Sequence, residues 1–259
     1  MRHLGPLPCT LDRTVQPLRP DEAHKLGCRI IGTLRNRPSI PFALVINYDR
    51  LYDFRFRGVD QSSRERVWTV IADDIYTKMG RPAVVLDPAA GRGEFINAIP
   101  AGERWIVDRV AHPSNLDPNV KTIIADIFEA ELPPDYFDGV FVSNFLEHLP
   151  TQDSVAELLA KLHQAMQPGG RIAVMGPNFK YCAKEYFDCA DHTLALTHLA
   201  VEEHVYAAGF VLGEVRSRYL PYSFRGLLPP SPALTGAYLR LPVAQRVLGK
   251  QFLIIADKP

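Results

Sequence analysis

The chain has 259 residues, of which 47% are hydrophobic and 22% charged, with 29 basic and 29 acidic side chains. These values are typical of a globular chain of one or two domains and exclude global disorder and fibrous proteins. A zero net charge argues against a dedicated nucleic-acid-binding protein. Four cysteines without a CxxC pair favour free thiols over a zinc ribbon. We expect a cytoplasmic protein, because no apolar run approaches the roughly 20 residues that span a bilayer and no signal peptide is evident.

The first 50 residues predict an extension that precedes the main domain. They are rich in proline and carry eight basic against four acidic side chains. The apolar run from Phe42 to Ile46 predicts a short strand or a docking segment. Such an extension can be partly disordered or can pack on a neighbouring subunit. We therefore expect an extension over residues 1–50 and one domain over residues 51–259.

A helix is predicted from Ser63 to Met79, ending at Gly80. Ser62 and Glu65 match the S-x-x-E capping box that marks the start of a helix. Apolar residues then follow at helical spacing, namely Val67, Trp68, Ile71 and Ile75.

Strands and helices alternate along the rest of the chain. Short apolar runs predict strands over residues 83–87, 105–107, 122–124, 139–142, 172–175, 211–215 and 252–256. Helices are expected over residues 94–98, 151–166 and 198–208, and Pro168-Gly169-Gly170 is expected to end the second of these. This alternation predicts an α/β fold with a mostly parallel sheet that helices cover on both faces.

The strongest signal of a ligand site is VLDPAAGRGEF at residues 85–95, which combines an apolar strand, an acid, a turn of small residues and a helix start. Small residues let the backbone approach a ligand closely, and a helix N-terminus favours electronegative groups. Open α/β sheets bind ligands outside the carboxyl ends of their strands, which is where this turn lies.

Acidic residues follow the next two predicted strands at similar intervals. Asp108 comes 21 residues after Asp87, and Asp126 comes 18 residues after Asp108. A carboxylate after the second strand can accept two hydrogen bonds from a ribose diol. A carboxylate near Asp126 can accept a hydrogen bond from an exocyclic adenine amine.

In this order, VLDPAAGRGEF, WIVD, IIADIFE, FDGVFVSNFLEHL and MQPGGRIAV resemble the class I S-adenosylmethionine-dependent methyltransferases over roughly residues 50–258. The resemblance implies a Rossmann-like sheet of seven strands with one antiparallel strand near the end, and S-adenosylmethionine as cofactor. The usual first glycine of the turn is Ala89 here, which can serve if its φ is negative. The implied cofactor contacts are Asp87, Ala89, Ala90, Gly91, Gly93, Asp108, Arg109, Asp126, Ile127, Ser143 and Asn144.

Further segments resemble methyltransferases of bacterial polysaccharide and secondary-metabolite gene clusters, namely LYDFRFRG, GEFINAI, GPNFKYCAKEYFDCADHTLALTH and LGKQFLIIADKP. This resemblance implies a small, sugar-like acceptor and favours methylation of a hydroxyl. Methylation of nitrogen or carbon in a small metabolite, and a non-methylating cyclase or isomerase on the same fold, stay open. SNFLEH stands where D/N-PP-[YF] would mark nucleic-acid amino-methylation.

Methylation of an alcohol needs a base near the acceptor oxygen, commonly His, Asp or Glu. His148 follows the fourth predicted strand beside Glu147, although this pair can instead fix the loop and the cofactor pocket. His192 lies in the polar and aromatic loop over residues 178–198, with Asp191 beside it. We therefore name His192, His148 and Asp191 as candidate catalytic residues.

The same loop supplies the candidate substrate contacts, which are Tyr181, Tyr186 and Asp188, together with Glu147. The spacing from Asp188 to His192 also has weak potential for metal ligation. No metal is predicted on balance. Tyr52 and Arg57 are predicted to cap the cofactor carboxylate or to close over the substrate, unless YDFRF is an edge strand or a packing turn.

Residues 216–250 contain six basic and no acidic side chains, together with five prolines. We expect residues 219–250 to form an inserted lid or interface segment. The basic side chains can attract an anionic substrate, a membrane surface or a second subunit. Apolar spacing favours an interface and a possible homodimer, through Leu239, Leu241, Val243 and Val247. The predicted partner is otherwise a small-molecule substrate, with neither nucleic acid nor membrane.

Overall fold

The computed structural model describes residues 46–58, 60–109, 116–222 and 231–259 of the chain. The chain divides into two compact units, residues 1–57 and residues 58–259. Most of the predicted extension lies outside the described residues, including the predicted strand or docking segment except for Ile46.

The described part of the first unit forms helix α2 (Tyr48–Arg55). The Asn47 side chain caps it by accepting a hydrogen bond from the backbone N–H of Arg50 at 3.0 Å. The Tyr52 and Phe56 rings stack with centroids 5.9 Å apart, and the Arg55 guanidinium lies 5.3 Å from the Tyr52 ring. The alternative of an edge strand is therefore wrong, because this segment closes helical hydrogen bonds from its capped first turn.

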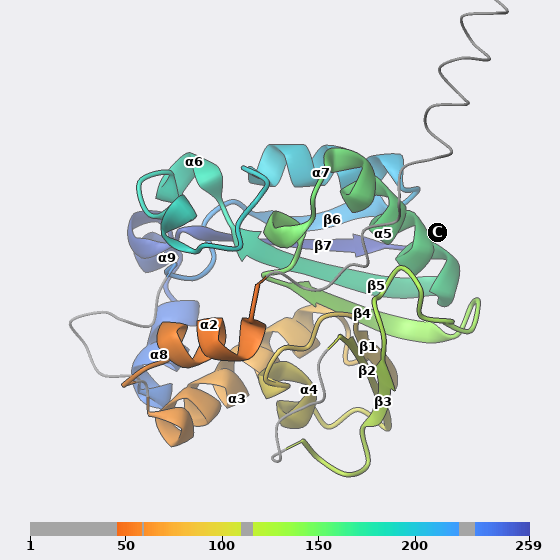
Figure 1. The fold of residues 1–259 in the computed structure, drawn as a ribbon, viewed down its shortest axis with the longest axis horizontal. Helices are drawn as coiled ribbons and strands as arrows, with labels where there is room; N and C mark the ends of the chain where they lie inside the picture. Colours follow the sequence, from red (N-terminus) through yellow and green to blue (C-terminus); the bar gives the residue numbers. More distant parts are fainter. Residues whose placement is uncertain (1–45, 59, 110–115, 223–230) are drawn as a thin grey trace, which may run out of the picture. The chain divides into compact units, whose positions relative to one another are not determined.

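The second unit is built on a single seven-stranded sheet with the strand order β3-β2-β1-β4-β5-β7-β6 (Figure 1). β7 pairs antiparallel with β5 and β6, whereas the other described pairs are parallel. The predicted α/β fold and its single antiparallel strand are thus confirmed. The strands are β1 (Val84–Asp87), β2 (Glu103–Asp108), β3 (Lys121–Ile124), β4 (Phe137–Ser143), β5 (Met166–Pro177), β6 (Val211–Arg216) and β7 (Gln251–Asp257).

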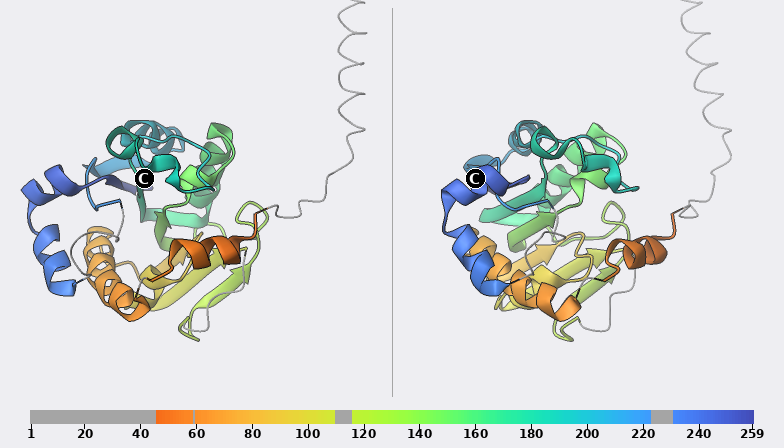
Figure 2. Two further views of the ribbon diagram at one scale, coloured as in Figure 1. Left: turned by 60° about the vertical axis from the view of Figure 1, so that its left-hand side comes forward. Right: turned by 90° about the vertical axis from the view of Figure 1, so that its left-hand side faces the viewer.

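Helices cover both faces of the sheet, and each face has its own core (Figure 2). Alternate strand residues enter the two cores: Val140 and Val142 of β4 pack on one side and Phe141 on the other. The first face carries α5 (Gln152–Ala165) and α7 (His198–Ala207), and the second carries α3 (Gln61–Lys78), α4 (Glu94–Ala98) and α8 (Pro232–Leu239). The remaining short helices are η1 (Leu146–His148), α6 (Phe179–Cys182), η2 (Tyr186–Asp188) and α9 (Pro242–Leu248).

Helix α3 begins two residues earlier than predicted, so the capping-box assignment is wrong. Asp60 is the N-cap, and its carboxylate accepts from the backbone N–H groups of Ser62 and Ser63 at 3.3 and 3.1 Å. This carboxylate satisfies two of the backbone donors that a helix start leaves open, so Ser62 lies inside the helix. The helix ends as expected before Gly80, whose φ is +84°.

The connection between α5 and β5 also differs from the expectation. The helix ends at Ala165, and Met166, with φ −82° and ψ 147°, is already extended and pairs with Phe137 of β4. Pro168, Gly169 and Gly170 therefore lie within the irregular start of β5 and do not end the helix. The Met166 side chain is fully buried in the core.

The segment between β6 and β7 forms two helices, α8 and α9, that sequence patterning did not predict. Each has a proline in its first turn, which suits a helix start because proline lacks the N–H that would be unbonded there. Leu241, Val243 and Val247 are exposed in the chain, and the predicted homodimer interface at these residues stays a prediction. Among the described residues, no helix combines the length and apolar character needed to cross a membrane.

Candidate active site

The carboxyl ends of β1 to β5 meet at one edge of the sheet, and the turn after β1 shapes its first part. Gly91 and Gly93 have φ values of +54° and +70°, in the left-handed region that glycine adopts at low cost. Gly93 is the N-cap of α4. Ala89 has no positive φ, so an alanine fits where the resemblance expects a glycine.

Asp108 connects the end of β2 to this turn. Its Oδ2 accepts a hydrogen bond from the backbone N–H of Gly91 at 3.1 Å. A Cβ atom added at Gly91 would meet no atom of the described residues within 4 Å, so the turn borders open space there. The half-buried Asp108 carboxylate therefore lies at the rim of that space, as a diol-binding carboxylate must.

Asp87, at the end of β1, is almost fully buried, with only 3% of its surface exposed. Its Oδ1 accepts a hydrogen bond from the backbone N–H of Ala89 at 3.3 Å. Burial raises the pKa of Asp87 to about 8, and the charges of Asp108 and Glu94 act in the same direction. The Asp87 carboxyl is therefore largely protonated at neutral pH in the free protein.

Asp126 and its neighbours form the turn after β3. Asp126 Oδ1 accepts from the backbone N–H of Phe128 at 3.0 Å, and its Oδ2 lies 3.4 Å from Arg109 Nε. Ile127 is buried, with 3% exposed. The ion pair thus connects the loops after β2 and β3, the two loops expected to hold the adenosine part of the cofactor.

Ser143 and Asn144 form the sharp turn after β4. Asn144 has a φ of +47°, and its Nδ2 donates to Ser143 Oγ at 3.0 Å. The Asn144 backbone N–H donates to the backbone oxygen of Met175 in β5 at 2.9 Å. This turn leads directly into η1, which carries Glu147 and His148.

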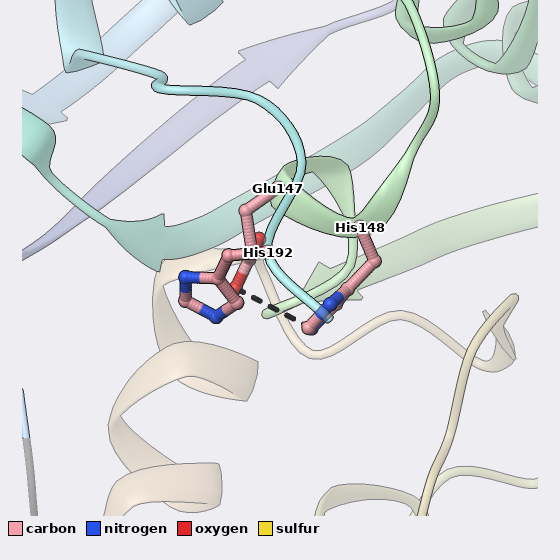
Figure 3. Close-up of side chains that lie close together, drawn as sticks. All are labelled: Glu147, His148 and His192. Atoms are coloured by element: carbon pink, nitrogen blue, oxygen red, sulfur yellow. Dashed lines mark ion pairs between the residues drawn. The ribbon is translucent and has the colours of Figure 1, made fainter. Parts of the chain in front are cut away.

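Glu147, His148 and His192 come together from the loops after β4 and β5 (Figure 3). One ligand-type atom from each lies within 4.8 Å of the others. The His148 and His192 rings meet edge to face, with centroids 4.9 Å apart. We call these three residues the EHH cluster. The predicted candidate bases His148 and His192 are thus neighbours in space, together with the predicted substrate contact Glu147.

Asp191 fixes the orientation of the His148 ring. His148 Nδ1 lies 2.9 Å from the backbone oxygen of Asp191 and 3.5 Å from its Oδ2. Because a carbonyl oxygen can only accept, Nδ1 carries the proton, and Nε2 faces Glu147 Oε1 at 4.0 Å. The sequence placed Asp191 beside His192, and the structure shows it also contacting the imidazole of His148.

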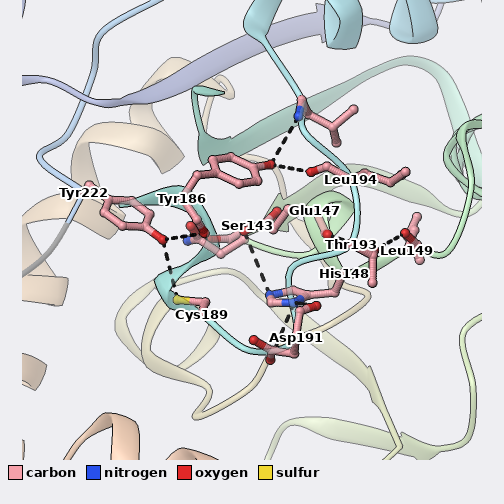
Figure 4. A network of polar contacts seen from close by, with 12 residues as sticks. Ser143, Glu147, His148, Leu149, Tyr186, Cys189, Asp191, Thr193, Leu194 and Tyr222 are labelled. Atoms are coloured by element: carbon pink, nitrogen blue, oxygen red, sulfur yellow. Dashed lines mark hydrogen bonds and ion pairs between the residues drawn. The ribbon is translucent and has the colours of Figure 1, made fainter. Parts of the chain in front are cut away.

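Thr193 holds the two loops together, and sequence analysis missed it (Figure 4). The backbone oxygen of Glu147 accepts from the N–H groups of Thr193 and Leu194 at 2.8 and 3.1 Å. The Thr193 hydroxyl is shared between the backbone oxygens of Glu147 and Leu149, at 3.1 and 2.5 Å. A single threonine in a polar loop carries no sequence signal for such contacts, since its partners lie more than 40 residues away.

Tyr186 supports the cluster from the interior of the protein and is fully buried. Its hydroxyl donates to the Leu194 oxygen at 2.7 Å and accepts from the Leu196 N–H at 3.2 Å, and its ring lies edge-on to His192 with centroids 4.9 Å apart. Burial raises the pKa of Tyr186 above its ordinary value. Tyr186, which was predicted to contact the substrate, thus lies where it supports the loop that carries His192.

Tyr222 extends this network from the segment after β6. Its hydroxyl donates to the Tyr186 backbone oxygen at 3.4 Å and lies 3.5 Å from Cys189 Sγ (Figure 4). Burial and the Cys189 contact raise the pKa of Tyr222. The segment predicted as a lid or interface thus contacts the loop that carries His192.

The other predicted substrate contacts lie in different surroundings. The Tyr181 ring of α6 stacks on His198 with centroids 6.3 Å apart, and the Arg218 guanidinium lies 4.0 Å from it. Asp188 is exposed at the end of η2. Tyr52 lies in α2 of the first unit, and Arg57 follows that helix. The roles predicted for these residues stay predictions.

Comparison with known proteins gives a family match over the centre of the chain. Residues 86–174 match the family model described as a methyltransferase domain (Methyltransf_11). No curated protein matches the chain in sequence.

Solved structures share the fold at low sequence identity. An S-adenosylmethionine-dependent methyltransferase from Archaeoglobus fulgidus is 20% identical over 82% of this chain and 100% of that chain, with a TM-score of 0.57. One from Mesorhizobium loti is 17% identical over 72% and 95%, with a TM-score of 0.53. The Burkholderia thailandensis 1,6-didemethyltoxoflavin-N1-methyltransferase is 19% identical over 95% and 93%, with a TM-score of 0.54.

The residues at the carboxyl edge fit S-adenosylmethionine in their chemistry. Asp108 would accept hydrogen bonds from the ribose hydroxyls, and Asp126 and Ile127 would contact the adenine. The turn from Asp87 to Gly93 would receive the methionine part, and its open space at Gly91 leaves room for a ligand. Residues 86–174 thus match a methyltransferase domain, and the sheet that carries them has the fold of S-adenosylmethionine-dependent methyltransferases.

Proposed function

We propose that the chain methylates a hydroxyl of a small molecule, such as a sugar-like or secondary-metabolite acceptor. The observation that supports this most is the position of the EHH cluster. Two of its members, Glu147 and His148, lie in η1 directly after the turn of Ser143 and Asn144, and the resemblance to the methyltransferases implies that this turn lies beside the sulfonium end of the cofactor. An alcohol holds its proton at neutral pH, so its methylation gains from groups that assist proton loss near the acceptor oxygen.

Each part of the site has a task in this reaction. When bound, S-adenosylmethionine supplies a methyl group on a positively charged sulfur, and the acceptor oxygen bonds to that carbon as the carbon–sulfur bond breaks. The hydroxyl proton must leave the acceptor oxygen in the same step. When its ring is neutral, His148 carries its proton on Nδ1, toward the Asp191 backbone oxygen, so Nε2 would receive the hydroxyl proton, and His192 lies beside it. The contacts of Thr193 hold the loops after β4 and β5 together and keep these groups in place. Such positioning lowers the activation barrier of methyl transfer.

The small-molecule acceptor has independent support. The chain has no net charge, and a nucleic-acid substrate would favour a basic surface. Two structures with the same fold are named for small-molecule acceptors, 1,6-didemethyltoxoflavin and geranyl diphosphate. The first is named for methylation of a nitrogen, so the fold does not select oxygen. The choice of a hydroxyl rests on the EHH cluster.

An acceptor screen tests this function. Purified protein with S-adenosylmethionine would be offered glycans, hydroxylated metabolites and matched amines, with products analysed by mass and by NMR. We expect a gain of one methylene unit located on an oxygen, and its loss in His192→Ala. Methylation on nitrogen or carbon would contradict the proposal. Turnover without a mass gain would favour a cyclase or isomerase, and salt-resistant retention on heparin would favour a nucleic-acid substrate.

A further inference from the structure

We propose that Glu147, His148 and His192 hold a divalent transition-metal ion of the Zn²⁺ class. The role given to the ion, assistance in proton loss from the acceptor hydroxyl, rests on the proposed function. Binding of the ion does not, because it follows from the donor atoms of the EHH cluster alone. No metal was expected from the sequence, where the weak signal for ligation was the segment from Asp188 to His192.

The distances within the cluster leave a gap that suits a cation. His148 Nε2 and Glu147 Oε1 are 4.0 Å apart, beyond hydrogen-bonding range. Ligands of a tetrahedral zinc ion lie about 2.0–2.2 Å from the metal and therefore roughly 3.3 Å from one another. The three ligand atoms already lie within 4.8 Å of each other. Side-chain rotations that move each ligand atom by about 1 Å or less would therefore complete such a site.

The surroundings of His148 are those of a metal ligand. Histidines that bind metals almost always donate their second ring N–H to a carbonyl or carboxylate, which fixes the tautomer. His148 Nδ1 makes this contact with the backbone oxygen of Asp191 at 2.9 Å. In the neutral ring, the electron pair on Nε2 faces Glu147 Oε1, 4.0 Å away, and these two donor atoms could bind one cation between them.

Burial adds an electrostatic argument for a cation. The side chains of Glu147 and Asp191 are each only 3% exposed, and both carboxylates flank the His148 ring. Buried carboxylates attract a cation more strongly than exposed ones, because their surroundings screen the charge less, and this holds beside the other contacts that they make. A bound divalent cation would stabilise both carboxylates, one by direct contact and the other through the imidazole.

The donor set indicates which ion fits. Two imidazole nitrogens and one carboxylate suit Zn²⁺, Co²⁺ or Fe²⁺, whereas Mg²⁺ and Ca²⁺ prefer oxygen ligands. Two histidines and one glutamate are also the protein ligands of one class of catalytic zinc sites, which keep a fourth position open. An acceptor hydroxyl in that position would have a lower pKa and would release its proton to water, because His148 Nε2 would bind the ion and could not receive it.

Titration of the metal-stripped protein with Co²⁺ tests this inference, because visible absorption bands report the coordination of Co²⁺ directly. We expect one Co²⁺ per chain in the wild type, displaced by Zn²⁺. His192→Ala and Glu147→Gln should bind it at least about 100-fold more weakly, since loss of even an outer-shell partner typically costs 10–100-fold. His204→Ala is the matched control, because His204 of α7 lies outside the EHH cluster, with its Nε2 2.8 Å from Gln152 Oε1, and should leave the spectrum unchanged.

The same variants show whether a loss of metal binding reflects a loss of folding or of cofactor binding. Far-UV circular dichroism and binding of S-adenosylhomocysteine should match the wild type in every variant. Zn²⁺ in hundredfold excess over the Kd of the wild type should raise the Tm of the wild type by about 5–10 °C and that of His192→Ala by no more than about 2 °C. Equal Co²⁺ affinity in wild type and His192→Ala, or no binding at micromolar Co²⁺, would overturn the metal site.

The acceptor screen tests the proposed function separately from the metal site. A product methylated on nitrogen or carbon by protein that binds Co²⁺ would overturn the hydroxyl acceptor and leave the metal site standing. Methylation of a hydroxyl that persists undiminished after complete metal removal would leave the proposed function standing and overturn the role of the ion.

Discussion

The carboxyl edge of the sheet has two parts that are built in different ways. On the cofactor side, the turn after β1 and the loops after β2 and β3 rely on backbone geometry and on carboxylates such as Asp108. On the acceptor side, the loops after β4 and β5 rely on side chains held by contacts between the loops, such as Thr193 to Glu147. The cofactor side is thus fixed locally, and the acceptor side depends on pairing of distant segments.

This difference implies that the two sides can be damaged separately. A change on the acceptor side should slow methyl transfer without weakening the binding of cofactor, and a change on the cofactor side should do the reverse. The variants below are arranged from the largest expected effect to the smallest, and each either separates the two sides or shows that they are coupled.

His192→Ala should give the largest effect. We expect kcat to fall by about 10²–10⁴-fold, because groups that assist proton transfer typically contribute that much. The affinity for S-adenosylhomocysteine should change less than about twofold, a difference below about 0.5 kcal/mol. Steady-state kinetics and calorimetric titration measure the two quantities, with His204→Ala as the control. If the affinity for S-adenosylhomocysteine fell together with kcat, the cofactor side and the acceptor side would be coupled.

Asp87→Asn should change the pH dependence of stability on the cofactor side. The pKa of Asp87 is raised to about 8 by burial, so the folded state keeps a proton that the unfolded state loses above its ordinary pKa near 4. The free energy of unfolding should therefore fall as pH rises from about 4 to 8, by up to about 1.4 kcal/mol per pH unit from this group. In Asp87→Asn this contribution disappears.

Urea unfolding of the free protein at several pH values between about 5 and 7.5 measures the effect, a window in which this group alone should give a steady slope. The exposed Asp153 in the first turn of α5 gives the control, since Asp153→Asn should follow the wild type. Parallel curves for the wild type and Asp87→Asn would mean that Asp87 ionises normally and that water reaches the end of β1.

Most of the fold and of the cofactor side could be predicted from the sequence, because residues close together in the chain determine them. The strands were predicted near their observed positions from short apolar runs, and the turn after β1 from neighbouring small residues such as Gly91 and Gly93. Boundaries were missed where a single contact decides them. Asp60 caps α3, which begins two residues before its predicted start. Met166, the predicted last residue of α5, is extended and buried.

The acceptor side could be predicted only as a set of residue types. His148 and His192 were named as alternatives, and nothing in the spacing showed that their rings meet. The contact from Asp191 to His148 spans 43 residues, and that from Thr193 to Glu147 spans 46. Contacts of this range depend on how two loops pack over the same sheet edge, which residue patterns do not encode.

Asp108→Asn should weaken the cofactor side specifically. Hydrogen bonds to a charged group contribute about 1.5–3 kcal/mol, so the Kd for S-adenosylhomocysteine should rise by about 10–150-fold. The variant keeps an oxygen that can accept the hydrogen bond from Gly91, so the turn should keep its conformation. Calorimetric titration measures the Kd, and Asp153→Asn should bind as the wild type does. An unchanged Kd would exclude Asp108 from the ribose site.

Thr193→Val gives the smallest effect and tests whether the contacts between the loops serve the chemistry. Valine has nearly the same shape but lacks the hydroxyl shared by the Glu147 and Leu149 oxygens, so we expect a loss of about 1 kcal/mol and a Tm lower by about 2–4 °C. Thr235→Val removes a comparable bond in α8, 2.9 Å from the Ser231 oxygen, and should cost similar stability. Only Thr193→Val should also lower kcat, because it alone loosens the EHH cluster. Equal kcat values in both variants would mean that the Thr193 hydroxyl contributes to stability alone.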